Sequence, residues 1–77
     1  MERKNIVGIR VRKARQNAKP PITQLELIAR LQVLGLIIEQ PALSKIERGY
    51  RPVTDNEVVA LSKALKVSAG WLLGIDK

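Results

Sequence analysis

The chain has no cysteine, no histidine and no phenylalanine, and its only aromatic residues are Trp71 and Tyr50. Without cysteine and histidine, the sequence excludes disulfides, zinc fingers and catalysis by a thiol or an imidazole. With so few aromatic side chains, a core must consist mainly of leucine, isoleucine and valine. We expect Trp71 to be its largest single residue.

Long apolar runs are also lacking. The longest stretch, Leu31 to Ile38, contains Gln32 and is far shorter than the roughly 20 residues that a membrane-spanning helix requires. The first residues, Met-Glu-Arg-Lys-Asn, lack the apolar segment of a secretory signal. We therefore expect no membrane partner and a cytoplasmic location, which the absence of cysteine also fits.

Positive charge is in excess. The 77 residues contain 14 Lys and Arg against 7 Asp and Glu, and the formal net charge is +7. Residues 1–20 are the most basic part, with Glu2 as their only acid. This balance is typical of a nucleic-acid-binding domain, although it also serves solubility or binding to anionic lipid. We expect one domain over residues 1–77, with no room for a sensor or autocleavage domain.

Capping residues and apolar periodicity predict an all-α chain of five helices, because no β-branched run alternates with polar residues. The first helix is expected to begin near Asn5 and to end before the Pro20-Pro21 pair, which cannot continue it. The other four are predicted at about Gln24–Leu34, at about Gln40–Arg48, at Asp55–Leu65 and after Ser68. One apolar stripe along each of the longer helices predicts one buried face. The stripes include Val7, Val11, Ala14 and Ala18 in the first helix and Val58, Leu61 and Leu65 in the fourth.

Local signals mark where several of these helices begin and end. Thr23 with Glu26, and Thr54 with Glu57, form two predicted capping boxes. Gly35 and Gly49 are expected to end the second and third helices, because glycine adopts the left-handed conformation without steric cost. The apolar residues Leu36, Ile37 and Ile38 predict a buried connection between those two helices. Two short helices joined in this way form a helix-turn-helix, whose second helix enters the major groove of DNA.

The order of these motifs resembles that of the phage Cro/repressor-type helix-turn-helix family. The motifs are T-Q-x-E-L from Thr23, A-L-S-K-I-E-R-G ending at Gly49, and A-L-K-V-S-A-G-W-L-L-G ending at Gly74. The resemblance covers about Val7 to Gly74. It implies a compact lambda-repressor-like domain that regulates transcription by reading a palindromic operator in double-stranded DNA. It further implies a homodimer, at least on DNA, and we expect no enzymatic activity, no cofactor and no metal.

Residues on the outward face and first turn of the third helix are expected to read bases. The resemblance places Gln40, Ala42 and Lys45 at base-reading positions, and Pro41 and Ser44 lie beside them. Glutamine can bond an adenine edge, lysine can donate to guanine, and the alanine methyl can meet a thymine methyl. The resemblance assigns phosphate contacts to Thr23, Gln24, Arg48 and Arg51. The amino-terminal end of the second helix suits that role because its free amides attract an anion.

Glu47 lies on the apolar face of the third helix, where an unpaired carboxylate would be strongly unfavourable. Arg15 borders the apolar stripe of the first helix, and the resemblance implies a structural ion pair between Arg15 and Glu47. The alternative is that Arg15 is solvated and that Glu47 pairs locally with Arg51 or Lys45.

The chain departs from the family pattern in three places. The interval from Gln24 to Glu47 is longer than usual, which we interpret as an added turn on the second helix and a looser connection. Ile28 stands where the family has alanine. Glu39 replaces the usual Ser or Thr cap of the third helix, so we expect Gln40 to cap it and Pro41 to be its first residue.

Other uses of the same sequence stay open. The fold can serve as an antitoxin or adaptor that docks a protein partner through Leu36-Ile37-Ile38, and exposure of that segment would distinguish this function. Binding to anionic membranes would require a broad exposed apolar face. The resemblance also allows Trp71 to contact a second subunit. Tyr50 is either a contact to the DNA backbone or an ordinary loop residue.

Overall fold

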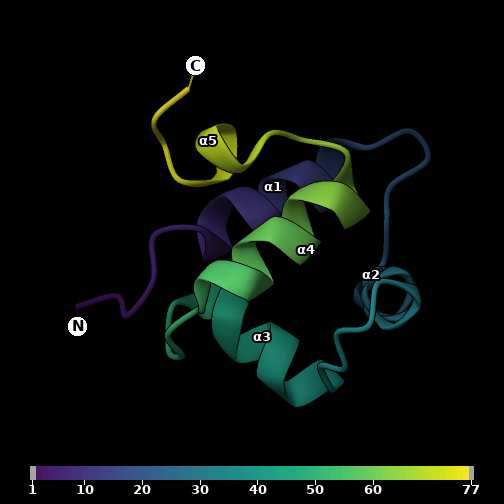
Figure 1. Ribbon diagram of the computed structural model, residues 1–77, viewed down its shortest axis with the longest axis horizontal. Coiled ribbons are helices and arrows are strands. Elements are labelled where there is room, and N and C mark those ends of the chain that lie inside the picture. The colour runs from purple at the N-terminus through teal and green to yellow at the C-terminus, as the bar shows by residue number, and fades with distance from the viewer. Residues whose placement is uncertain (1, 77) are drawn as a thin grey trace.

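The computed structural model describes residues 2–76, which form five α-helices and no strand (Figure 1). The helices are α1 Gly8–Asn17, α2 Gln24–Val33, α3 Gln40–Arg48, α4 Asp55–Leu65 and α5 Ala69–Leu72. The predicted all-α class and five-helix order are confirmed. The first and last residues of the expected domain 1–77 lie outside the described residues. No helix within residues 2–76 is long and apolar enough to cross a bilayer.

The helices pack so that α3 lies at one edge of the domain. Figure 1 shows α1 and α4 side by side, with α5 above them, α3 below and α2 at the side. Helix α1 contacts α3, α4 and α5, and α2 contacts α3 and α4. The lower side of α3 is covered by no other helix of the described chain (Figure 1). One face of this helix is therefore available to a ligand.

The core consists of aliphatic residues from every helix and from the residue before α1. Eight of them are at most 2% exposed: Val7, Val11, Leu27, Leu31, Leu43, Ile46, Leu61 and Leu72. The predicted stripe of α4 is buried as expected. Trp71 is half-buried and packs against this core at its margin. The Arg10 guanidinium lies 5.2 Å from the centroid of the indole ring and donates to the Trp71 carbonyl at 3.0 Å, which joins α1 to α5.

The predicted helix ends are present for the most part. The Thr54 and Glu57 box is complete, with the Thr54 hydroxyl accepting from the Glu57 amide at 3.2 Å and the Glu57 carboxylate accepting from the Thr54 amide at 3.0 Å. The box at Thr23 is only half formed, because the Glu26 carboxylate pairs with Arg30 at 2.8 Å. Gly49 ends α3 with a φ of +82°, as expected.

Two predicted helix starts were wrong. Helix α1 begins at Gly8, three residues after Asn5. The Asn5 carboxamide oxygen accepts a hydrogen bond from the Gly8 amide at 2.8 Å, but Asn5 itself lies outside the helix. Helix α3 has Glu39 at its N-cap position, with no side-chain cap bond, so Gln40 is its first residue. Pro41 fits the second position because the first amides of a helix have no partner within it.

The connection into α3 is only partly buried, so the prediction of a buried apolar connection was wrong for one residue. Ile38 is 4% exposed and Leu36 is half-buried, but Ile37 is 79% exposed. Burial thus alternates along this segment, and only its alternate residues face the core.

Candidate nucleic-acid interface

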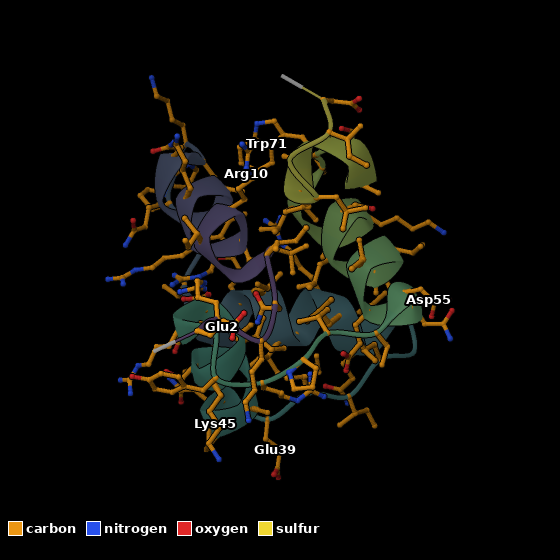
Figure 2. The ribbon with its side chains drawn as sticks, turned by 90° about the vertical axis from the view of Figure 1, so that its left-hand side faces the viewer. Glu2, Arg10, Glu39, Lys45, Asp55 and Trp71 are labelled. Carbon is orange, nitrogen blue, oxygen red and sulfur yellow. The ribbon has the colours of Figure 1, made fainter. Side chains whose placement is uncertain are left out.

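All five residues expected to read bases lie on α3 with at least part of their surface in solvent. Gln40, Pro41 and Lys45 are exposed, and Ala42 and Ser44 are half-buried. Figure 2 shows the Lys45 side chain pointing away from the domain on the same side as Glu39. This short helix thus offers amide, hydroxyl, methyl and ammonium groups to solvent. Such groups can hydrogen-bond to the donors and acceptors on base edges and can contact their methyl groups.

The opposite side of α3 is fixed in the domain. Leu43 and Ile46 are fully buried and Glu47 is 7% exposed. These residues are three and four positions apart and therefore share one face of the helix. The sharp division of this short helix into a buried and an exposed face gives its outward side chains a rigid base.

The structure brings Arg15 and Glu47 together in a two-pronged ion pair. Arg15 Nε and Nη2 each lie 2.7 Å from a different oxygen of the Glu47 carboxylate. The two side chains are 12% and 4% exposed. Hydrogen bonding to Glu47 raises the pKa of Arg15 from its ordinary value. A third Arg15 nitrogen, Nη1, donates to the Ile22 carbonyl at 3.0 Å, so this one side chain links α1, the start of the α2 region and α3.

Gln24 extends this ion pair to the reading surface. Its Nε2 donates to Glu47 Oε1 at 3.2 Å, and its Oε1 accepts from Gln40 Nε2 at 3.3 Å. A continuous chain of polar contacts thus runs from Arg15 through Glu47 and Gln24 to Gln40. The side chain of Gln24, expected to contact phosphate, is also placed to orient a residue expected to read bases.

A polar cleft of about 170 Å³ opens between α1, α2 and α3. Seven residues line it, and three of them are arginines and one is a glutamate: Arg12, Arg15, Gln16, Gln24, Ser44, Glu47 and Arg48. Because Arg15 and Glu47 neutralise each other, Arg12 and Arg48 give the cleft a positive charge. Both of these arginines are exposed. The cleft can accept an anionic group such as a phosphate, and Arg12 and Gln16 were not among the residues predicted from the sequence.

The other residues expected to contact phosphate have different surroundings. Thr23 is exposed, and its hydroxyl accepts from the Glu26 amide at 3.1 Å. The Arg51 guanidinium donates to both oxygens of Glu57, at 3.0 and 2.8 Å. Hydrogen bonding from Arg51 lowers the pKa of the Glu57 carboxyl from its ordinary value. Arg51 therefore forms an internal ion pair, and any contact with phosphate must use its remaining donors.

The segment before α1 holds the carboxyl end of α3, which sequence reasoning missed. Arg3 donates to the carbonyls of Glu47 and Arg48 at 3.1 and 3.0 Å. Asn5 Nδ2 donates to the carbonyls of Ile46 and Arg51 at 3.0 and 2.8 Å. The last carbonyls of a helix have no partner within it, and these side chains supply one. No local sequence signal points to bonds between residues more than 40 positions apart.

A second, apolar cleft of about 330 Å³ lies between the start of α4 and α5. It is lined by Val53, Asp55, Val58, Val59, Ala69 and Leu73. Val59 is 47% exposed, so part of this apolar surface meets solvent. Figure 1 shows α5 on the opposite side of the domain from α3. A contact made through α5 would therefore leave the reading surface free.

Comparison with known proteins gives one match. The model of the helix-turn-helix family matches residues 11–72, which include most of α1 and all of the other four helices. The matched region thus contains all the residues of the uncovered α3 surface and the polar cleft. No curated protein and no solved structure matches the chain.

Proposed function

Because the chain belongs to the Cro/repressor-type, lambda-repressor-like helix-turn-helix family, a family of DNA-binding regulators, we propose that it is a cytoplasmic repressor that reads a palindromic operator as a homodimer. The observation that carries this proposal is the uncovered surface of α3. It presents Gln40, Ala42 and Lys45, whose side chains can contact base edges, beside a cleft of net positive charge. Base contacts provide specificity, and phosphate contacts provide affinity and register.

Selection of bound duplexes from a random pool tests this function. We expect one enriched motif with two-fold symmetry, because a symmetric dimer places two recognition helices on symmetric half-sites. A pool that remains random after repeated rounds would reject sequence-specific binding. A single asymmetric motif would retain specific binding but reject the symmetric dimer.

Lys45→Ala and Gln40→Ala should each weaken binding to the selected operator by about 2 kcal/mol and relax preference at particular base pairs. Both side chains are exposed, so the fold should not change. The measurement is the dissociation constant for the operator and for each of its single-base variants. If either protein variant keeps the relative preferences of the parent, that residue does not read bases.

Phosphate contacts should appear in the salt dependence. We propose that Thr23, Gln24, Arg48 and Arg51 contact phosphates, and that Arg12 joins them from the rim of the polar cleft. Arg48→Ala should flatten the slope of log affinity against log salt by about one unit, because each neutralised phosphate releases counterions. Lys63→Ala, which removes the same charge from the exposed side of α4, is the control and should leave the slope unchanged. An unchanged slope for Arg48→Ala would remove it from the interface.

For the homodimer, we propose the apolar cleft between α4 and α5 as the contact surface. The half-exposed position of Val59 allows a charge there without disturbing the core. Val59→Lys should leave binding to a half-site unchanged and should reduce binding to the full operator. Equal affinity of parent and variant for the full operator would place the dimer contact elsewhere.

The burial pattern of residues 36–38 supports a DNA-binding role over an adaptor role. An adaptor that docks a protein through this segment needs a continuous apolar surface. Ile38 is buried and Leu36 is half-buried, so Ile37 alone projects from the three.

A further inference from the structure

Ile37 is an exposed apolar residue three positions before the recognition helix. Its exposed fraction is 79%, although it lies between the half-buried Leu36 and the buried Ile38. A single exposed isoleucine is common on protein surfaces and has no significance by itself. Its direction relative to the reading surface decides whether it has a function.

The pattern of exposure indicates that Ile37 lies on the side of the reading surface. Exposure alternates along residues 36–39, because Leu36 and Ile38 are turned toward the core and Ile37 and Glu39 toward solvent. Glu39 has the extended angles φ −82° and ψ 158°, and in extended backbone residues two positions apart point to the same side. Figure 2 shows Glu39 projecting on the same side as Lys45, and the alternation of exposure assigns Ile37 to that side as well.

Ile37 is also close enough to Gln40 along the chain to lie beside the reading surface. Gln40 is three positions after Ile37, and the chain can span at most about 11 Å over that interval. Ile37 therefore lies at the edge of the surface formed by Gln40, Ala42 and Lys45. The connection between α2 and α3 thus brings an additional side chain to this surface.

The chemistry of an isoleucine selects one kind of group in the groove. It can neither donate nor accept a hydrogen bond, so phosphate oxygens and most base-edge groups are poor partners for it. The C5-methyl of thymine is the apolar group that the major groove presents. The neighbouring Glu39 carboxylate is repelled by phosphates, which favours placing this segment toward base edges. Val33, the last residue of α2, and Leu34, the first residue after it, are 88% and 46% exposed.

We propose that Ile37 is a specificity-determining residue that contacts the C5-methyl group of a thymine at the edge of each half-site. This assignment rests on the proposed function, because it requires α3 to lie in the major groove. The segment 36–39 then contacts bases in addition to the recognition helix.

Replacement of thymine by deoxyuridine tests the assignment, because it removes only the C5-methyl group and preserves base pairing. Each thymine of the selected operator is replaced in turn, and the dissociation constant is measured for the parent and for Ile37→Ser. At one thymine of each half-site, loss of the methyl should weaken binding by the parent about fourfold, the effect of one buried methyl group. Ile37→Ser should bind the thymine and deoxyuridine operators equally at that position.

Ile75→Ser is the matched control. Ile75 is 75% exposed and lies three residues after α5, the helix on the side of the domain opposite α3 (Figure 1). This variant should keep the parent's fourfold ratio between the two operators, whatever it does to the affinity itself. Thermal unfolding of both variants should match that of the parent, because both side chains are largely in solvent.

The assignment would be overturned if Ile37→Ser kept the parent's ratio at every position, or if no deoxyuridine replacement affected the parent. Either result, obtained with an operator that is bound specifically, would leave the proposed function intact. If no duplex is enriched from the random pool, the proposed function fails and the role of Ile37 fails with it.

Discussion

Arg15→Ala and Glu47→Ala should each lower the free energy of unfolding by about 3–5 kcal/mol, because each leaves a buried charge without its partner. This is a large part of the stability of a small domain. Both oxygens of Glu47 are bonded to Arg15 at 2.7 Å, and the two side chains are almost fully enclosed. The double variant should lose less than the sum of the single losses, because it leaves no unpaired charge.

Denaturant unfolding of the four proteins measures this coupling. The exposed pair of Glu26 and Arg30, with side chains 48% and 37% exposed, provides the control. Glu26→Ala should lower stability by at most about 1 kcal/mol, because solvent screens such a pair. Operator binding should weaken in both single variants of the buried pair, because Glu47 belongs to the recognition helix. Additive losses in the cycle would mean that Arg15 and Glu47 are not coupled.

Gly8→Ala should lower the free energy of unfolding by about 3 kcal/mol, at the upper end of the usual range for overpacking. In an exposed helix the same change would stabilise the protein by about 1 kcal/mol. Here a Cβ atom on Gly8 would lie 2.0 Å from the carbonyl oxygen of Ile46 and 2.9 Å from its carbonyl carbon. Backbone atoms cannot rotate away, so α1 would have to separate from the carboxyl end of α3.

Gly70→Ala is the matched control for Gly8→Ala. A Cβ atom on Gly70 would approach the carboxylate of Asp76, which is the end of a flexible and exposed side chain. We expect its effect on the free energy of unfolding to stay within about 1 kcal/mol. Equal effects of the two substitutions in thermal or denaturant unfolding would contradict the close packing of α1 against α3.

Local sequence signals predicted much of the helical framework. The complete capping box at Thr54 and the left-handed Gly49 mark real helix ends, because these motifs depend on residues only a few positions apart. The bounds expected for the fourth helix and the expected end of the third helix at Arg48 agree with the structure, and the second helix ends one residue earlier than expected. The buried stripe of α4 follows from its apolar periodicity.

The signals failed where distant residues decide the structure. Asn5 has the chemistry of a helix cap, but its amide nitrogen bonds carbonyls 41 and 46 positions away. Arg51 can pair with a phosphate or with Glu57, and the sequence does not rank these partners. The contact between Arg15 and Glu47, 32 positions apart, was expected from the family resemblance and not from local pattern. In the apolar run 36–38, hydrophobicity alone does not reveal which residue the extended backbone turns outward.

Only part of the candidate interface was predicted, because some of its contacts join residues that are far apart in the sequence. The outward face of α3 follows from helical spacing once the buried residues are known. The roles of its residues in base reading stay predictions, as do the phosphate contacts. The bonds from Arg3 to α3 and the link from Gln24 to Gln40 depend on how α1, α2 and α3 meet, which the sequence does not describe.

Site-directed cleavage of DNA would test the central claim that α3 faces the major groove. The chain has no cysteine, so a single introduced thiol can carry an iron chelate that cleaves nearby DNA. Glu39→Cys places the chelate beside the reading surface without removing a proposed base reader (Figure 2). Asp76→Cys places it four residues after α5, the helix on the opposite side of the domain from α3 (Figure 1). We predict cleavage confined to each half-site from position 39 and none above background from position 76. Stronger cleavage from position 76 would mean that α3 does not face the major groove.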